Sequence, residues 1–269
     1  MIIDFHTHVF PDKIASATIS SLQANSSNKP YTNGTVDGLI SSMTDNNVDI
    51  CVNLPVLTKP SQFETVLNFA VSINKRFSDS DKKIISFAGI HPDCDNIPDK
   101  MRQVFEAGIK GVKIHPDYQS TYIDSEGYYQ IIKSASDYGL IVVTHSGIDD
   151  GYKGQPVRCS PNRVLNLIKK IDYEKFVLGH YGAHKQWQEV LEKLVKTNFY
   201  FDTAVTLSKI DKQLFLDILK LHGEDKVLFA TDSPWSDVGN DVAILKSYGL
   251  SKDTLEKILY KNAVKLLGL

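Results

Sequence analysis

Short apolar runs alternate with longer amphipathic stretches along most of the chain. The apolar runs are rich in Val, Ile and Phe, as buried strands are, and the stretches between them repeat apolar residues at helical spacing. We predict strands over 2–6, 48–54, 83–90, 111–115, 140–145, 176–180, 199–201 and 227–230. We predict helices over 36–46, 62–77, 127–138, 161–171, 186–196, 212–222 and 242–248.

This alternation favours a parallel sheet, because parallel neighbours need a crossover connection. Eight strand repeats predict closure into a (β/α)₈ barrel. A doubly wound open sheet is the structural alternative, but it would normally place a glycine-rich phosphate loop after the first strand, where this chain has His6-Thr-His8. No linker or shift in composition divides the sequence, so we expect one domain over residues 1–269.

The stretch over 20–35 breaks the alternation, because it is rich in Ser, Asn, Thr and Gly and too polar to bury. We predict a long loop there. Long connections in compact domains often cover functional sites, so it is a candidate lid, with a mobile surface loop as the alternative.

Histidines gather where the predicted strands end. Seven of the eight lie at or just past a strand end, and only His222 lies at a helix end. In a parallel barrel the functional groups lie at the carboxyl ends of the strands. The pattern therefore predicts a site built from histidines at one end of the barrel.

Four strand-end residues form a candidate metal site: His6, His8, His145 and Asp232. His6 and His8 alternate along the first strand, so both can face one ion. Three imidazoles and a carboxylate suit zinc or a similar divalent ion, with a position left open for water as in catalytic sites. A structural zinc would more often use closely spaced thiolates, whereas the three cysteines here are dispersed.

Composition limits the partners. With 42% hydrophobic and 23% charged residues and a formal charge of −2, the chain is typical of a soluble globular protein with no basic excess for nucleic acid. No apolar stretch approaches the length that spans a bilayer, so we expect no membrane partner. Dispersed cysteines indicate reduced thiols, and we expect a cytoplasmic protein with a small-molecule substrate. The sequence leaves a homodimer open.

Five motifs occur in an order that resembles a known family: His6-Thr-His8, Lys113-Ile-His115-Pro, His145-Ser-Gly, Gly-His180-Tyr-Gly and Thr-Asp232-Ser-Pro-Trp. The chain resembles the amidohydrolase superfamily, in the branch of amidohydrolase-related proteins that includes aminocarboxymuconate semialdehyde decarboxylase and the lactone hydrolases. The resemblance implies a barrel holding one divalent ion, for which we expect zinc, that activates water. It does not name a substrate.

The resemblance also implies roles for individual residues. Asp232 would accept the proton of the water as well as bind the ion, and His180 would be a hydrogen-bonding or proton-transfer partner, or a ligand if a second metal were present. Lys113 occupies the strand that supplies a carboxylated lysine or glutamate in two-metal relatives. We favour an unmodified ammonium that pairs with Asp232 or a substrate carboxylate, the alternative being a side chain that extends out to solvent.

Three further residues are candidates for contacting the substrate. His115 shares a strand face with Lys113, and Trp235 follows the last strand closely enough to wall a pocket. Arg158 could reach a substrate carboxylate, although an arginine in a polar segment is more often solvated.

The leading functional hypothesis is a metal-dependent hydrolase of a small, anionic amide, lactone or other ester. A non-oxidative decarboxylase is the alternative, because the same branch uses the same ligands to remove CO₂. A binuclear phosphoesterase and a catalytically silent metal-binding barrel are further alternatives.

Overall fold

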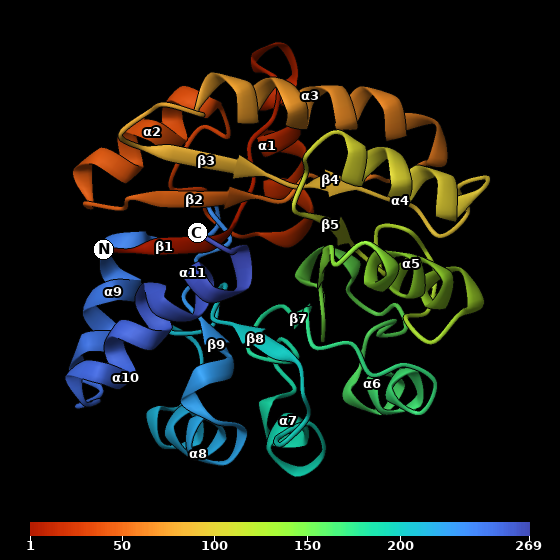
Figure 1. Cartoon of the computed structure of the whole chain (residues 1–269). Helices are drawn as coiled ribbons and strands as arrows, with labels where there is room; N and C mark the ends of the chain where they lie inside the picture. Colours follow the sequence, from red (N-terminus) through yellow and green to blue (C-terminus); the bar gives the residue numbers. More distant parts are fainter.

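A ring of parallel strands forms the centre of the molecule, with helices around its outside (Figure 1). The structure is a computed structural model that describes all 269 residues. Its strands are β1 (Ile3–Thr7), β2 (Ile50–Asn53), β3 (Lys83–Ser86), β4 (Ala88–Gly89), β5 (Gly111–Ile114), β6 (Ile141–Thr144), β7 (Phe176–Leu178), β8 (Tyr200–Asp202) and β9 (Val227–Leu228).

The helices follow the strands in sequence. They are α1 (Asp12–Ser26), α2 (Val36–Asp45), α3 (Phe63–Arg76), α4 (Ile97–Glu106), α5 (Glu126–Asp137), α6 (Pro161–Ile168), α7 (Trp187–Lys193), α8 (Lys212–His222), α9 (Val238–Ser247), α10 (Lys252–Glu256) and α11 (Asn262–Leu267). Three short 3₁₀ turns, η1 (Pro60–Gln62), η2 (Asp150–Tyr152) and η3 (Glu224–Lys226), and a π-helical turn, η4 (Lys257–Lys261), complete the elements. No helix is both long and apolar enough to cross a membrane.

The two sheets join into one closed barrel at two places, through the chain itself at Phe87 and through backbone hydrogen bonds between β9 and β1. Strand β3 pairs with β2, and β4 pairs with β5. Only Phe87 separates β3 from β4, so these two segments are halves of one strand. The nine labelled strands therefore correspond to the eight strands of the barrel. At the other seam Phe5 N donates to Phe229 O at 2.9 Å and Asp232 N donates to His6 O at 2.8 Å, joining the end of β9 to β1. The predicted (β/α)₈ barrel is confirmed.

Alternate strand residues enter different parts of the core. In β2, Ile50 and Val52 belong to a cluster with residues of the facing strands, such as Val143 and Val177, and with helix α11. Cys51 belongs instead to the larger cluster that contains the helix side chains. Strands such as β2, buried on both faces, leave the strand ends rather than the barrel interior as the place for polar chemistry.

One prediction about the fold is wrong: the polar stretch over 20–35 is not all loop. Helix α1 continues to Ser26 and ends at Ser27, whose φ of 63° is left-handed. The helix forms despite its Ser and Thr because Ile19 packs against Gly34, where an added Cβ would lie 2.7 Å from Ile19 Cγ1. Tertiary packing here overrides weak helix propensity.

Candidate metal centre

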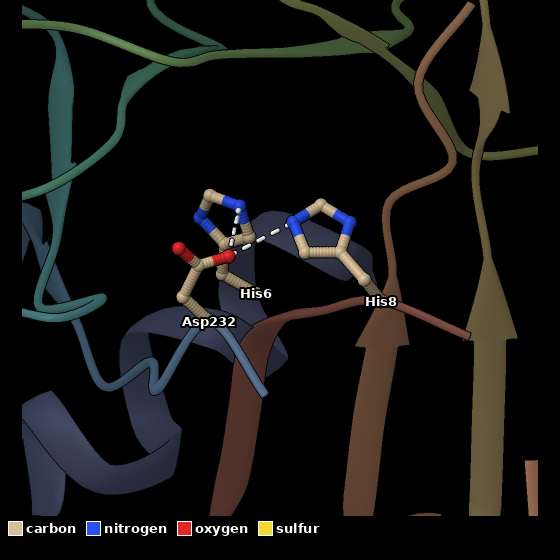
Figure 2. A group of neighbouring side chains, drawn as sticks. All are labelled: His6, His8 and Asp232. Carbon is tan, nitrogen blue, oxygen red and sulfur yellow. Dashed lines mark ion pairs between the residues drawn. The ribbon is translucent and has the colours of Figure 1, made fainter. Parts of the chain in front are cut away.

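His6 and His8 direct the same ring nitrogen at one carboxylate oxygen of Asp232 (Figure 2). His8 Nε2 lies 2.9 Å and His6 Nε2 3.4 Å from Asp232 Oδ1. The two imidazoles come from the carboxyl end of β1 and the carboxylate from the segment that follows β9. The three residues together form a candidate site for a metal ion.

A buried network around Asp4 holds these two segments together. Asp4 accepts hydrogen bonds from Thr231 Oγ1 at 2.5 Å, from Thr231 N at 3.0 Å and from His6 N at 3.3 Å. The β1–β2 pairing shifts register between Asp4 and Thr7, and such an irregularity redirects the side chains that follow it. Asp232 itself has a φ of 62°, a left-handed conformation that is uncommon for residues other than glycine. The sequence thus fixes the backbone on both sides of the candidate site.

The hydrogen bonds of three imidazoles fix which nitrogen carries the proton. His8 Nδ1 lies 2.8 Å from Leu54 O and His180 Nδ1 3.0 Å from Ala204 O, and a carbonyl can only accept. His6 Nδ1 lies 2.8 Å from a carboxylate oxygen of Asp202. In each neutral ring the Nε2 atom therefore keeps its lone pair.

This donor set fits a divalent cation. The Nε2 lone pair of His8 faces the anionic Asp232 Oδ1 at 2.9 Å, and two acceptors at that distance repel unless a proton or a cation lies with them. Imidazole nitrogens whose other ring nitrogen is held by a carboxylate or a carbonyl are the usual arrangement of histidine metal ligands. His6, His8 and Asp232 together meet this description.

Electrostatics keep the carboxylate of Asp232 ionised. Burial alone would raise the pKa of Asp232, but the neighbouring imidazoles of His6 and His8 outweigh burial and hold that pKa well below its usual range. Burial also lowers the pKa of His6 well below its usual value and that of His180 to about 4. At neutral pH the imidazoles of His6 and His180 are thus neutral, and the carboxylate of Asp232 is an anion.

The fourth expected ligand, His145, lies beside this group rather than in it. Its Nδ1 is 2.8 Å from His180 Nε2, and its buried Nε2 has no hydrogen-bond partner. His145 also stacks on His115, with ring centroids 4.3 Å apart and an interplanar angle of 11°. His115, His145 and Asp149 form a second set of potential metal ligands, so two candidate groups adjoin one another.

Lys113 lies at the floor of the site and is 1% exposed. Its Nζ donates to His6 Nε2 at 2.9 Å, and no Lys113–Asp232 ion pair within 4.0 Å forms. Burial lowers the pKa of Lys113 to about 8, although Asp202 and Asp232 act against that shift. The structure thus differs from the expected pairing with Asp232 and excludes a side chain extended into solvent.

A single cavity of about 840 Å³ contains nearly all of the predicted site residues. His6, His8, His145, His180 and Asp232 line it together with the expected substrate contacts Lys113, His115 and Trp235. Arg158 is absent from the lining, and its Nη1 donates to Asp117 Oδ1 at 3.4 Å. The structure therefore does not place Arg158 against a ligand in this cavity, because the buried Asp117 holds the guanidinium behind its wall.

Asp202 is a site residue that sequence reasoning missed. Its Oδ2 accepts from His6 Nδ1 at 2.8 Å, and its Oδ1 accepts from His180 N at 2.9 Å and Ala204 N at 3.1 Å. One buried carboxylate thus orients the His6 ring and fixes the backbone that carries His180. The rule that sites lie at strand ends would have found Asp202, because it is the last residue of β8.

The role of Lys113 can be separated from that of the ligands by substitution. We expect Lys113→Met to leave the metal content unchanged, because Met fills similar space and no ligand atom is lost. The loss of a charged donor should lower kcat/KM for an anionic substrate by about 10- to 100-fold. Elemental analysis and steady-state kinetics measure the two effects. An emptied metal site in this variant would make Lys113 a ligand instead.

Comparisons with known proteins show which structures and which family this chain resembles. The structure is similar to a putative amidohydrolase from Staphylococcus aureus, with a TM-score of 0.70 and 21% identity over 100% of this chain and 99% of the other. It is similar to 2,6-dihydroxybenzoate decarboxylase from Rhizobium, with a TM-score of 0.70 and 14% identity over 99% and 98% of the chains. No curated protein matches the sequence.

A third similar structure is that of 5-carboxyvanillate decarboxylase from Novosphingobium aromaticivorans with bound manganese, with a TM-score of 0.72 and 14% identity over 100% of this chain and 97% of the other. These likenesses show the barrel fold. The sequence itself matches the family model described as Amidohydrolase over residues 3–269. The chain therefore belongs to the amidohydrolase family.

Proposed function

We propose that this protein is a hydrolase that uses one divalent metal ion to cleave a small, anionic amide, lactone or other ester. The observation that carries the proposal is the shared carboxylate oxygen, Asp232 Oδ1, which lies 2.9 Å from His8 Nε2 and 3.4 Å from His6 Nε2 in the floor of the cavity. His145, which follows strand β6, is the proposed fourth ligand through Nδ1, and to bind the ion this nitrogen would have to lose the proton that it donates to His180 Nε2 at 2.8 Å.

Zinc is the ion we expect, because imidazole-rich sets suit it, although manganese is bound in the similar 5-carboxyvanillate decarboxylase structure. When bound, such an ion lowers the pKa of water from 15.7 to about 7 and polarises a carbonyl group.

The chain's own residues then manage the proton. Asp232 is an anion at neutral pH and can accept a proton from the attacking water. It returns that proton to the leaving oxygen or nitrogen as the bond from the carbonyl carbon breaks. His180 has its Nδ1 proton committed to Ala204 O, so its Nε2 can only accept a hydrogen bond and would orient the water. A role for neutral His180 in donating to an oxyanion does not fit this arrangement.

Substrate binding falls to residues around that centre. Lys113 is the one basic side chain of Lys or Arg type in the lining, so it is the proposed partner of a substrate carboxylate. His115 stacks with Tyr118, with ring centroids 3.9 Å apart, and Trp235 completes the wall near Asp232. Together these groups would hold the scissile carbonyl beside Asp232 and His180.

Decarboxylation is the second candidate, supported by the fold shared with two aromatic-acid decarboxylases. In that reaction the substrate loses CO₂ and its carbon gains a proton, so a residue at the reacting carbon must act as an acid. The pKa of Asp232 is held well below its usual range, so this residue is ionised and cannot act as that acid, and decarboxylation would need another proton donor at the reacting carbon. We therefore place hydrolysis first.

The test is to screen small carboxylates, lactones, esters and amides in water labelled with oxygen-18. Hydrolysis predicts a product that has gained one water, with the label in a carboxyl oxygen. A product that has lost the mass of CO₂, without label, would show decarboxylation instead. Tight binding of a screened compound without any turnover would indicate a catalytically silent barrel.

A further inference from the structure

The cavity has two chemically different halves. All the Lys, Arg, Asp and Glu side chains of the lining come from four residues: Lys113, Asp149, Asp150 and Asp232. Lys113 lies in β5, and the three aspartates follow β6 or β9. The wall formed by residues 9–69 contains no such side chain. Charge is therefore confined to the half that contains the candidate metal centre.

Two helix faces form much of the uncharged wall. On α1, Ala15 and Ile19 are buried in the protein, while Ile14, Thr18 and Leu22 line the cavity at four-residue spacing. A second stripe of α1 thus faces the cavity. Its C-terminal end reaches η2 on the charged side, where a Cβ added to Gly151 would lie 4.0 Å from Asn25 Cβ.

Helix α3 supplies the second face. Thr65, Val66 and Phe69 line the cavity, and their spacing of one, three and four residues places them on one side of the helix. Phe10 and Val56, from the segments after β1 and β2, add further apolar surface to this wall. Ile14 is 44% exposed, so the wall includes a large apolar side chain that the protein itself does not cover.

The size of the cavity also favours a ligand that is larger than a small acid. About 840 Å³ lies near the upper end of the roughly 300–1,000 Å³ typical of ligand pockets. A small acid bound at Lys113 would leave most of this volume to water against the uncharged wall, in which Ile14, Leu22, Val66 and Phe69 lie beside Thr18 and Thr65. Removing apolar surface from water is favourable by roughly 25 cal/mol per Å², so an apolar group of the ligand would gain affinity there.

We propose that the substrate carries an uncharged, apolar arm that lies between α1 and α3 while its reacting end lies at the metal centre. We call the region between Ile14 and Leu22 of α1 and Val66 and Phe69 of α3 the arm site. Its residues lie outside the catalytic set, so the inference rests on the proposed function only for the reacting end of the substrate. Acyl or alkylaryl compounds extended by several carbon atoms are the substrate class that fits.

The test uses straight-chain hydroxamic acids from acetohydroxamate to decanohydroxamate, which share a metal-binding head and differ only in the apolar chain. Calorimetry with the zinc-loaded protein should show affinity rising about fourfold per methylene over the first several carbons, as burial of about 0.8 kcal/mol per CH₂ predicts. In the Ile14→Ser/Phe69→Ser double variant this gain should fall sharply, while the affinity for acetohydroxamate stays the same.

Matched controls are Val71→Ser and Phe105→Ser. Both remove an exposed apolar side chain, at 37% and 51% exposure, from α3 and α4 outside the cavity. They should keep the full gain with chain length. An affinity independent of chain length in the wild type, or an equal gain in the double variant, would overturn the proposal.

Primary alcohols from butanol to decanol separate the arm site from the metal centre, because they lack a metal-binding head. Thermal stabilisation of the metal-free protein should increase with alcohol length and fall in the double variant. If stabilisation increases with alcohol length but no substrate is hydrolysed, the arm site is supported and only the proposed reaction is wrong. If hydrolysis occurs but neither series depends on length, the arm site is wrong.

Discussion

Replacing Asp232 by Asn should lower turnover by about 10²–10⁴-fold, the range typical of a lost general base. Asn keeps the size of the side chain but removes the anion that lies between His6 Nε2 and His8 Nε2. Metal affinity should also fall, because an amide oxygen is a weaker ligand than a carboxylate. Steady-state kinetics at saturating metal separates the two losses, since added metal restores occupancy without restoring the base.

Asp241→Asn is a matched control for this substitution. Asp241 is another buried carboxylate, on α9, and it accepts a hydrogen bond from Ser236 at 2.6 Å outside the cavity lining. Turnover of this variant should remain close to that of the wild type. Retention of more than about a tenth of the activity by Asp232→Asn at saturating metal would contradict the role of Asp232 as the base.

Replacing Asp202 by Asn should weaken metal binding by about 10- to 100-fold, the usual cost of losing a group that orients a metal ligand. The amide would no longer offer His6 Nδ1 a charged acceptor, and in one orientation it would present a donor to that N–H. Competition with a chelator measures the metal dissociation constant. Excess metal should restore most of the activity, which it should not do for Asp232→Asn.

The same Asp241→Asn variant controls for the loss of a buried negative charge. If Asp202→Asn bound metal as tightly as the wild type, the His6–Asp202 hydrogen bond at 2.8 Å would have no function in ligand orientation. If excess metal failed to restore activity, Asp202 would act on the reaction through His180, whose backbone N donates to it at 2.9 Å.

The barrel could be predicted because each of its strands is a short apolar run between amphipathic helices. The strand split at Phe87 could not be foreseen, but it does not change the topology. Helix α1 was not predicted because its stability comes from tertiary packing, with Ile19 against Gly34, rather than from the helix propensity of its residues. Its polar residues are compatible with the exposed face of a helix as well as with a loop, so their polarity does not distinguish the two.

The sequence correctly predicted which strand-end residues lie close together, but it did not predict the partners of their side chains. His6, His8 and Asp232 converge as their positions on β1 and after β9 suggested. Lys113 donates a hydrogen bond to His6, and Arg158 donates one to Asp117. Both contacts depend on distances between segments that are far apart in the sequence, which residue spacing does not specify. His145 shows the same limit, because its two ring nitrogens face different neighbours.

The metal content of the purified protein tests the central claim most directly. Elemental analysis should find one divalent ion per chain in the wild type and none in the His6→Ala/His8→Ala double variant. The control is His91→Ala, which removes a buried strand-end histidine whose Nδ1 accepts from Asp93 N at 3.1 Å outside the cavity lining, and it should keep the ion. Two ions per chain in the wild type, or an ion retained by the double variant, would contradict a single metal held by His6, His8 and Asp232.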